Sequence, residues 1–129
     1  IPTETGAASA IGKVLPSLDG KLSGSAMRVP VSDGSVIDLT LELDKKVTKE
    51  EINSVFKESI NETLNYTEDP IVSSDVIGCS CGALVDGLLT NVLETDDKRL
   101  VKVVAWYYNE FGYSSQMVRL ISYMSDNNM

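Results

Sequence analysis

The chain has 129 residues, of which 43% are hydrophobic and 23% charged, a composition typical of one folded globular domain and not of a disordered segment. Eleven Lys and Arg against nineteen Asp and Glu give a net charge of −8, which argues against binding to nucleic acid or to an anionic membrane surface. No apolar run approaches the roughly 20 residues needed to span a bilayer, so we predict no nucleic-acid partner and no membrane segment.

The first half of the chain predicts two helices and two strands. Small residues before Pro16 predict a helix over 5–15, which Thr3 or Thr5 can cap, and a turn-rich connector follows. Alternating patterns predict strands over 26–31 and 35–43. The buried face of the second strand should carry Ile37, Leu39, Leu41 and Leu43.

A capping box, with Thr48 as the cap and Glu51 at the third helical position, opens the next predicted helix. The face that it docks on the sheet should carry Ile52, Val55, Phe56 and Ile60. Residues 64–81 are expected to be rich in loops with short strands. Residues 83–93 and 99–107 then predict two strands, and the second is apolar enough to be central.

A final amphipathic helix is expected after Gly112, with an apolar stripe of Met117, Leu120, Ile121 and Met124. The order of elements predicts an α+β fold. We expect a largely antiparallel sheet with helices packed on one face, ending in this amphipathic C-terminal helix.

The residue inventory excludes several kinds of chemistry. The chain has no histidine and only two cysteines, Cys79 and Cys81. It therefore contains no Ser–His or Cys–His nucleophile pair, and two sulfurs do not supply the roughly four ligands of a zinc site. A disulfide across one intervening residue would be strained, so we predict two reduced cysteines and no metal site within the chain.

Three local features favour ligand binding. Thr5 and Gly6 stand at a predicted helix start, where free N–H groups favour an anion, although a plain helix cap has the same pattern. The fork-shaped guanidinium of Arg28 suits a phosphate, although it can equally form a salt bridge with one of the many acids. Asn109 and Tyr113 follow an apolar strand and can hydrogen-bond an amide-bearing ligand, although a core strand entering a turn explains them as well.

These residues also carry a family resemblance that covers essentially the whole chain. The matching motifs, in order, are Thr5-Gly6-Ala7-Ala8, Gly12-Lys13-Val14, Gly20-Lys21-Leu22, Arg28-Val29-Pro30 and Asn109-Glu110-Phe111-Gly112-Tyr113-Ser114. Together they resemble the C-terminal part of glyceraldehyde-3-phosphate dehydrogenase, an NAD-dependent phosphorylating enzyme of glycolysis. The family's catalytic cysteine and histidine have no counterpart here, so the resemblance implies that this chain alone is inactive.

The resemblance assigns roles residue by residue. Thr5, Gly6 and Arg28 are expected to bind the phosphate of glyceraldehyde 3-phosphate or inorganic phosphate. Asn109 is expected to hold the nicotinamide carboxamide of NAD, with Tyr113 beside it. NAD itself would be bound mainly by a missing N-terminal Rossmann domain.

The resemblance also implies an organisation for the molecule. Residues 1–111 would be the C-terminal portion of the catalytic domain, and residues 112–129 a helix that packs against the N-terminal portion of the same chain. The expected assembly is a homotetramer, and the expected location is cytoplasmic. Two alternatives stay open: a noncatalytic remnant or assembly module, and a fragment of the related erythrose-4-phosphate dehydrogenase.

Overall fold

A computed structural model of the protein describes residues 1–94 and 98–128, which form two compact units, Ile1–Val31 and Ser32–Met129. The first unit holds β1 (Pro2–Thr3), α1 (Ala7–Val14), a short 3-10 helix η1 (Pro16–Leu18) and β2 (Ala26–Met27). The helix predicted over 5–15 is confirmed, and Pro16 follows its end as expected.

The strand predicted over 26–31 is wrong in length, because β2 has only two residues and pairs antiparallel with β1 alone. The Arg28 N–H donates to the Ile1 carbonyl oxygen at 2.8 Å and extends this pairing by one residue. Pro30 has no N–H to donate to a ladder, so the sequence beyond Val29 cannot continue it in regular fashion. The alternating pattern of side chains therefore predicted a strand longer than the one that forms.

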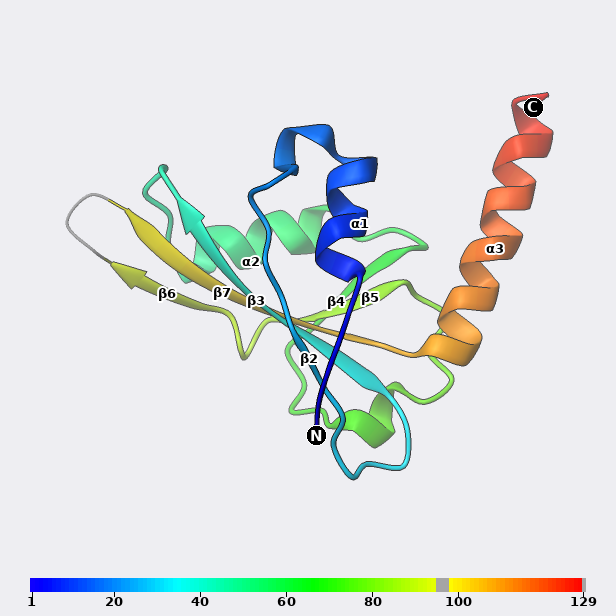
Figure 1. Cartoon of the computed structure of the whole chain (residues 1–129), viewed down its shortest axis with the longest axis horizontal. Coiled ribbons are helices and arrows are strands. Elements are labelled where there is room, and N and C mark those ends of the chain that lie inside the picture. Colours follow the sequence, from blue (N-terminus) through cyan, green and yellow to red (C-terminus); the bar gives the residue numbers. More distant parts are fainter. Residues whose placement is uncertain (95–97, 129) are drawn as a thin grey trace. The chain divides into compact units, whose positions relative to one another are not determined.

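The second unit is built on a five-stranded sheet (Figure 1). Its strands are β3 (Ser35–Leu43), β4 (Leu64–Thr67), β5 (Ala83–Asp86), β6 (Asn91–Glu94) and β7 (Arg99–Tyr107). The order is β3-β7-β5-β4, with β6 also paired to β7, and only the β4–β5 pair is parallel. The apolar strand β7 is central, as predicted, and the α+β class is confirmed.

The core lies on one face of β7. Its buried members are Val85, Val101, Val103 and Ala105, three of which alternate along β7 as a pleated strand requires. The helix α2 (Lys49–Glu58) adds Ile52 and Phe56 to this core. The predicted capping box is present: the Glu51 N–H donates to Thr48 Oγ1 at 3.2 Å, and the Thr48 N–H donates to Glu51 Oε2 at 2.8 Å.

Burial on the sheet face is less extensive than the sequence pattern predicts. Ile37 and Leu39 of β3 are 44% and 38% exposed, and Val55 and Ile60 are 60% and 50% exposed. A ten-residue helix is about 15 Å long, whereas nine strand residues span about 30 Å, so α2 covers only part of β3. Leu41 and Leu43, nearer the end of β3, do pack against the core.

The strand predicted over 83–93 is in fact two strands, β5 and β6, which pair with different halves of the same edge of β7. Asp86 causes the break, because its Oδ1 accepts from the N–H groups of Leu88 and Leu89 at 3.1 and 3.3 Å and closes a turn. The loop-rich reading of 64–81 is confirmed by β4 and the short 3-10 helix η2 (Ser73–Val76).

The last helix, α3 (Asn109–Asp126), begins earlier than predicted and contains Gly112 in its second turn. None of the helices that the structure describes is both long enough and apolar enough to cross a membrane. In Figure 1, α3 leaves the end of β7 and extends away from the sheet, so its far half has few neighbours within this unit.

Candidate functional site

A concave site lies in the second unit at the junction between β7 and α3. β7 ends at Tyr107, Tyr108 is extended with φ −123° and ψ 113°, and the first helical hydrogen bond runs from the Gly112 N–H to the Tyr108 carbonyl at 3.0 Å. The chain therefore turns from strand to helix over a single residue. Ligand groups commonly bind at such strand ends.

A pocket of about 230 Å³ opens at this junction. Its lining comes from the 81–82 segment, the end of β7 and the first two turns of α3: Cys81, Gly82, Tyr107, Tyr108, Asn109, Gly112, Tyr113 and Gln116. The volume lies below the range of about 300–1,000 Å³ for sites that enclose a whole drug-sized ligand. It suits one ring of a larger molecule.

The structure brings the two predicted cofactor-binding residues together. Asn109 and Tyr113 lie one helical turn apart on α3 and both line the pocket. Within residues 1–94 and 98–128, neither the Asn109 amide nor the Tyr113 hydroxyl has a hydrogen-bond partner, and Tyr113 is 69% exposed. The amide offers both a donor and an acceptor, which is the complement of another carboxamide.

Two other pocket residues have perturbed titration. Burial, the larger cause, and a contact with the Cys79 thiol raise the pKa of Cys81 to about 12. Cys81 is only 6% exposed and is therefore a neutral thiol at physiological pH, which fits a packing role and not a nucleophile. Burial, followed by the nearby carboxylates of Asp33 and Glu110, raises the pKa of Tyr108, so its hydroxyl keeps its proton.

Two glycines allow α3 to approach the wall of the pocket closely. A Cβ on Gly112 would lie 2.9 Å from the Cys81 carbonyl oxygen, and a Cβ on Gly82 would clash with the Gln116 side chain. Gly112 is thus required inside the helix by contact, despite its low helix propensity. The sequence marked Gly112 only as a turn residue and so misplaced the start of the helix.

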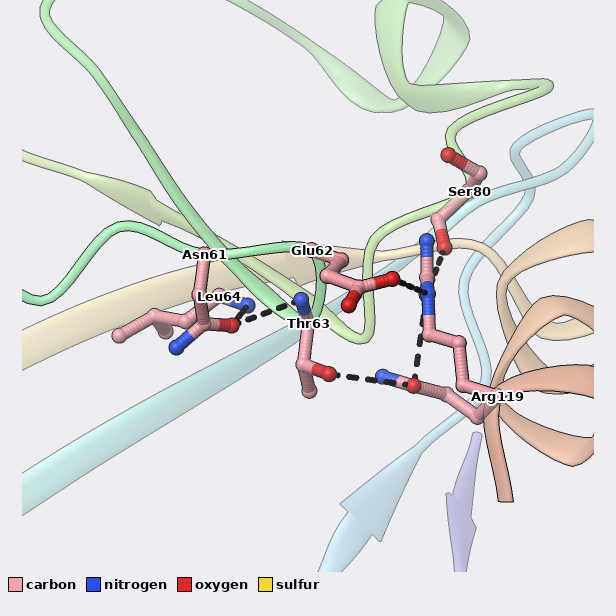
Figure 2. Close-up of polar contacts among 7 residues, drawn as sticks. Asn61, Glu62, Thr63, Leu64, Ser80 and Arg119 are labelled. Atoms are coloured by element: carbon pink, nitrogen blue, oxygen red, sulfur yellow. Dashed lines mark hydrogen bonds and ion pairs between the residues drawn. The ribbon is translucent and has the colours of Figure 1, made fainter. Parts of the chain in front are cut away.

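Polar contacts fix the middle of α3 against the same wall (Figure 2). The Arg119 Nη1 donates to the Ser80 carbonyl at 2.8 Å and to Gln116 Oε1 at 3.3 Å. The Thr63 hydroxyl donates to the same Gln116 oxygen at 3.3 Å, and Arg119 Nε lies 3.5 Å from Glu62 Oε2. Sequence reasoning missed Gln116 and Arg119, although their spacing of four and seven residues from Gly112 puts all three on one helix face.

The predicted phosphate-binding residues all lie in the first unit. The Thr5 Oγ1 accepts the Ala7 N–H at 3.2 Å, while Gly6 occupies the cap position of α1. Thr5 therefore stands one residue before the cap, with its backbone at the amino end of the helix. The Ala10 N–H donates to the Gly6 carbonyl at 3.0 Å as the first helical bond.

Arg28 is exposed, and in the described part of the chain its guanidinium forms neither an ion pair nor a hydrogen bond. The register of β1 and β2 puts Arg28 opposite Ile1, whereas Thr5 lies beyond the other end of that ladder. No hydrogen bond joins Arg28 to Thr5 or Gly6 among the described residues. Their joint role in binding phosphate stays a prediction.

Comparison with known families gives one match over most of the chain. The profile for "Glyceraldehyde 3-phosphate dehydrogenase, C-terminal domain" matches residues 1–109. The match includes both the first unit and the sheet, and it ends at Asn109, the first residue of α3.

Comparison with curated proteins agrees. Over 125 residues, the chain is 54% identical to glyceraldehyde-3-phosphate dehydrogenase of Streptococcus pyogenes and 52% identical to that of Streptococcus dysgalactiae subsp. equisimilis. Each alignment covers 97% of this chain but 37% of the relative. The chain therefore spans little more than a third of the length of these relatives, and it matches their C-terminal part.

Proposed function

This chain belongs to the glyceraldehyde-3-phosphate dehydrogenase family, and we propose that it supplies the phosphate-binding and nicotinamide-orienting groups of an NAD-dependent phosphorylating dehydrogenase. The residues assigned to phosphate are Thr5, Gly6 and Arg28, and those assigned to the nicotinamide are Asn109 and Tyr113. The substrates are glyceraldehyde 3-phosphate and inorganic phosphate.

The observation that carries the proposal is the unpartnered Asn109 amide at the rim of the pocket. Asn109 is exposed, and its carboxamide offers both a donor and an acceptor, the pattern that complements the nicotinamide carboxamide. The pocket is large enough for one ring and its amide but not for a dinucleotide. The rest of NAD would therefore be bound by the N-terminal portion of the protein.

NAD supplies the hydride acceptor for oxidation of the aldehyde. The part played by this chain is orientation: Asn109 fixes the rotation of the carboxamide and so determines which ring face the substrate meets. Tyr108 and Tyr113 add aromatic surface beside the ring, and the protonated Tyr108 brings no negative charge to the site. Cys81 lines the same pocket, but its nearly buried thiol is neutral and supplies no nucleophile.

The phosphate role rests on charge and exposure. The Arg28 guanidinium is exposed and has no acidic partner among the described residues, so in this acidic chain it keeps its capacity for an anion. The amino end of α1 adds N–H groups and a positive dipole end at Thr5 and Gly6. These two features lie in one unit, and we propose that both contact phosphate groups.

The remaining parts of the enzyme are proposed to lie outside these residues. A cysteine nucleophile and a histidine base, which the chain lacks, belong to the N-terminal portion of the same protein. The exposed apolar side chains of α3 would pack against that portion. We further propose a homotetramer that works in the cytoplasm.

The test compares steady-state kinetics of the full-length enzyme with and without the Asn109 amide. Asn109→Ala should raise the KM for NAD about tenfold or more, the usual result of losing well-formed hydrogen bonds to one ligand, while the KM for phosphate stays unchanged. Lys102→Ala, which removes an exposed pair with Asp38 at 2.8 Å, is the matched surface control and should change neither value.

If Asn109→Ala changes neither the KM for NAD nor kcat, this pocket does not bind the cofactor. Full activity of the wild-type enzyme with erythrose 4-phosphate and little with glyceraldehyde 3-phosphate would instead select the related dehydrogenase. If the full-length protein reduces NAD with neither aldehyde, the assembly-module alternative takes the place of the proposal.

A further inference from the structure

One face of α3 both presents the amide to the pocket and docks the helix on the sheet unit. Asn109, Gly112, Gln116 and Arg119 follow one another at spacings of three, four and three residues, so they form a single stripe along the helix. Asn109 begins the stripe at the pocket rim, and Arg119 ends it ten residues further on. Any rotation of the helix about its axis would move the whole stripe.

Two contacts at the far end of the stripe hold it. The Arg119 guanidinium donates to the Ser80 carbonyl at 2.8 Å, one residue before the pocket residue Cys81. The Gln116 oxygen accepts from Arg119 and from the Thr63 hydroxyl, both at 3.3 Å. Figure 2 shows Arg119 reaching from α3 toward Ser80 on one side and Glu62 on the other.

The surface that receives these contacts is itself rigid. Asn61 Oδ1 accepts the N–H groups of Thr63 and Leu64 at 2.8 and 2.9 Å, which closes the turn into β4 (Figure 2). The Thr63 carbonyl in turn accepts the N–H of Gly82 at 2.7 Å, which ties the turn to the pocket wall. The anchor of α3 and the wall of the pocket are therefore one hydrogen-bonded body.

The other face of α3 provides no competing anchor within the described residues. Val118, Leu120 and Ile121 are 64%, 56% and 64% exposed. The Arg119 side chain, in contrast, is 25% exposed, and its ion-pair partner Glu62 is 80% exposed. Since exposed pairs contribute little, the hydrogen bonds from Arg119 to the Ser80 carbonyl and from Thr63 to Gln116 hold the helix more than the charge pair does.

We propose that Arg119, acting with Gln116, is a positioning residue that fixes the rotation of α3 and thereby aims the Asn109 amide at the nicotinamide carboxamide. The inference rests on the proposed function, because Arg119 would orient the Asn109 amide, which in turn contacts the nicotinamide carboxamide. Arg119 touches no cofactor atom in this account. It acts through the helix.

The experiment is a double-mutant cycle in the full-length enzyme, with KM for NAD, KM for phosphate and kcat measured for each variant. Arg119→Ala should raise the KM for NAD about tenfold, within the range of couplings measured in shared hydrogen-bond networks, and leave the KM for phosphate unchanged. In the Asn109→Ala background, the same change should raise the KM for NAD hardly further, because the amide that Arg119 would orient is absent. Arg119→Lys should restore part of the loss, since an ammonium can still donate to the Ser80 carbonyl.

Gln116→Ala is the second variant and should repeat the pattern more weakly, which keeps the test available if Arg119→Ala does not fold. Lys102→Ala controls for the loss of an exposed cation. Additive effects of Arg119→Ala and Asn109→Ala, or an equal rise in both KM values, would overturn the positioning role while leaving the proposed function standing. If Asn109→Ala alone has no effect on NAD, the proposed function fails instead.

Discussion

At the scale of a single residue, Arg28 is the cation to which we assign phosphate binding. It is an exposed arginine in a chain with nineteen acidic residues, yet among residues 1–94 and 98–128 no carboxylate pairs with it. Other cations of the same chain do find acids, as Lys57 does with Glu68 at 2.8 Å. The salt-bridge alternative finds no partner for Arg28 among the described residues, and the anion-binding role of Arg28 stays a prediction.

Arg28→Ala should raise the KM for inorganic phosphate or for the aldehyde phosphate, because a charge-assisted contact contributes roughly 1.5–3 kcal/mol. Initial rates at varied phosphate concentration measure this in the full-length enzyme. Lys57→Ala is the matched control, since it removes an exposed cation that is already paired. If phosphate dependence is the same in Arg28→Ala and wild type, Arg28 does not contact phosphate.

The two cysteines should differ in reactivity. Because burial and the contact with the Cys79 thiol raise the pKa of Cys81 to about 12, its thiol stays almost entirely protonated at pH 8. Iodoacetamide at this pH should therefore label Cys79, which is half-buried, and spare the buried Cys81, as read from the mass of the peptide that holds both. Urea should expose Cys81 to labelling, and rapid labelling of Cys81 in the native protein would contradict its assigned packing role.

Among the elements, those with strong local signals were predictable from sequence. The capping box located α2, and the alternation of residues 35–43 and the apolar run of 99–107 matched β3 and β7. The ends of several other strands could not be predicted in this way. The break between β5 and β6 depends on Asp86 closing a turn, and the short β2 depends on its pairing with β1.

Part of the candidate site could likewise be predicted from the sequence. Motif similarity identified Asn109 and Tyr113, and the structure places them together at one pocket. The opposite wall, from Ser80 to Gly82, precedes Asn109 by 27 to 29 residues along the chain. No pattern in its own sequence indicates that it lines a pocket. Gln116 and Arg119 were missed because, on a polar helix surface, side chains that dock cannot be told from those that face water.

The docking of α3 leads to a prediction for Gly112→Ala. The new Cβ would stand 2.9 Å from a backbone oxygen, which cannot move aside as a side chain can. We expect the strain to exceed the roughly 1 kcal/mol gained in helix propensity and to lower the free energy of unfolding by about 1–2 kcal/mol. Urea denaturation measures the change.

Gly24→Ala is the matched control for Gly112→Ala. Its Cβ would lie 3.8 Å from the Ala8 Cβ, an ordinary contact, so little change in stability is expected. Equal or greater stability of Gly112→Ala relative to wild type would show that α3 is not packed against the Cys81 carbonyl as described.

At the scale of the whole molecule, many large apolar side chains are exposed, and α3 and β3 both contribute to them. Met117, Val118 and Ile121 of α3 are at least half exposed, and Val36 and Ile37 of β3 are 49% and 44% exposed. Such surface favours burial by a partner. In a chain that spans 37% of the length of its relatives, we propose that the N-terminal portion covers α3 and that subunit contacts in the tetramer account for other parts.

The most direct test of the account is the initial rate of NAD reduction by the full-length protein while glyceraldehyde 3-phosphate and inorganic phosphate are varied independently. We expect a rate that requires both, exceeds the rate with erythrose 4-phosphate, and is absent with residues 1–129 alone, since they contain no histidine and no catalytic cysteine motif. Reduction of NAD that does not depend on phosphate, or no reduction with glyceraldehyde 3-phosphate, would contradict the account.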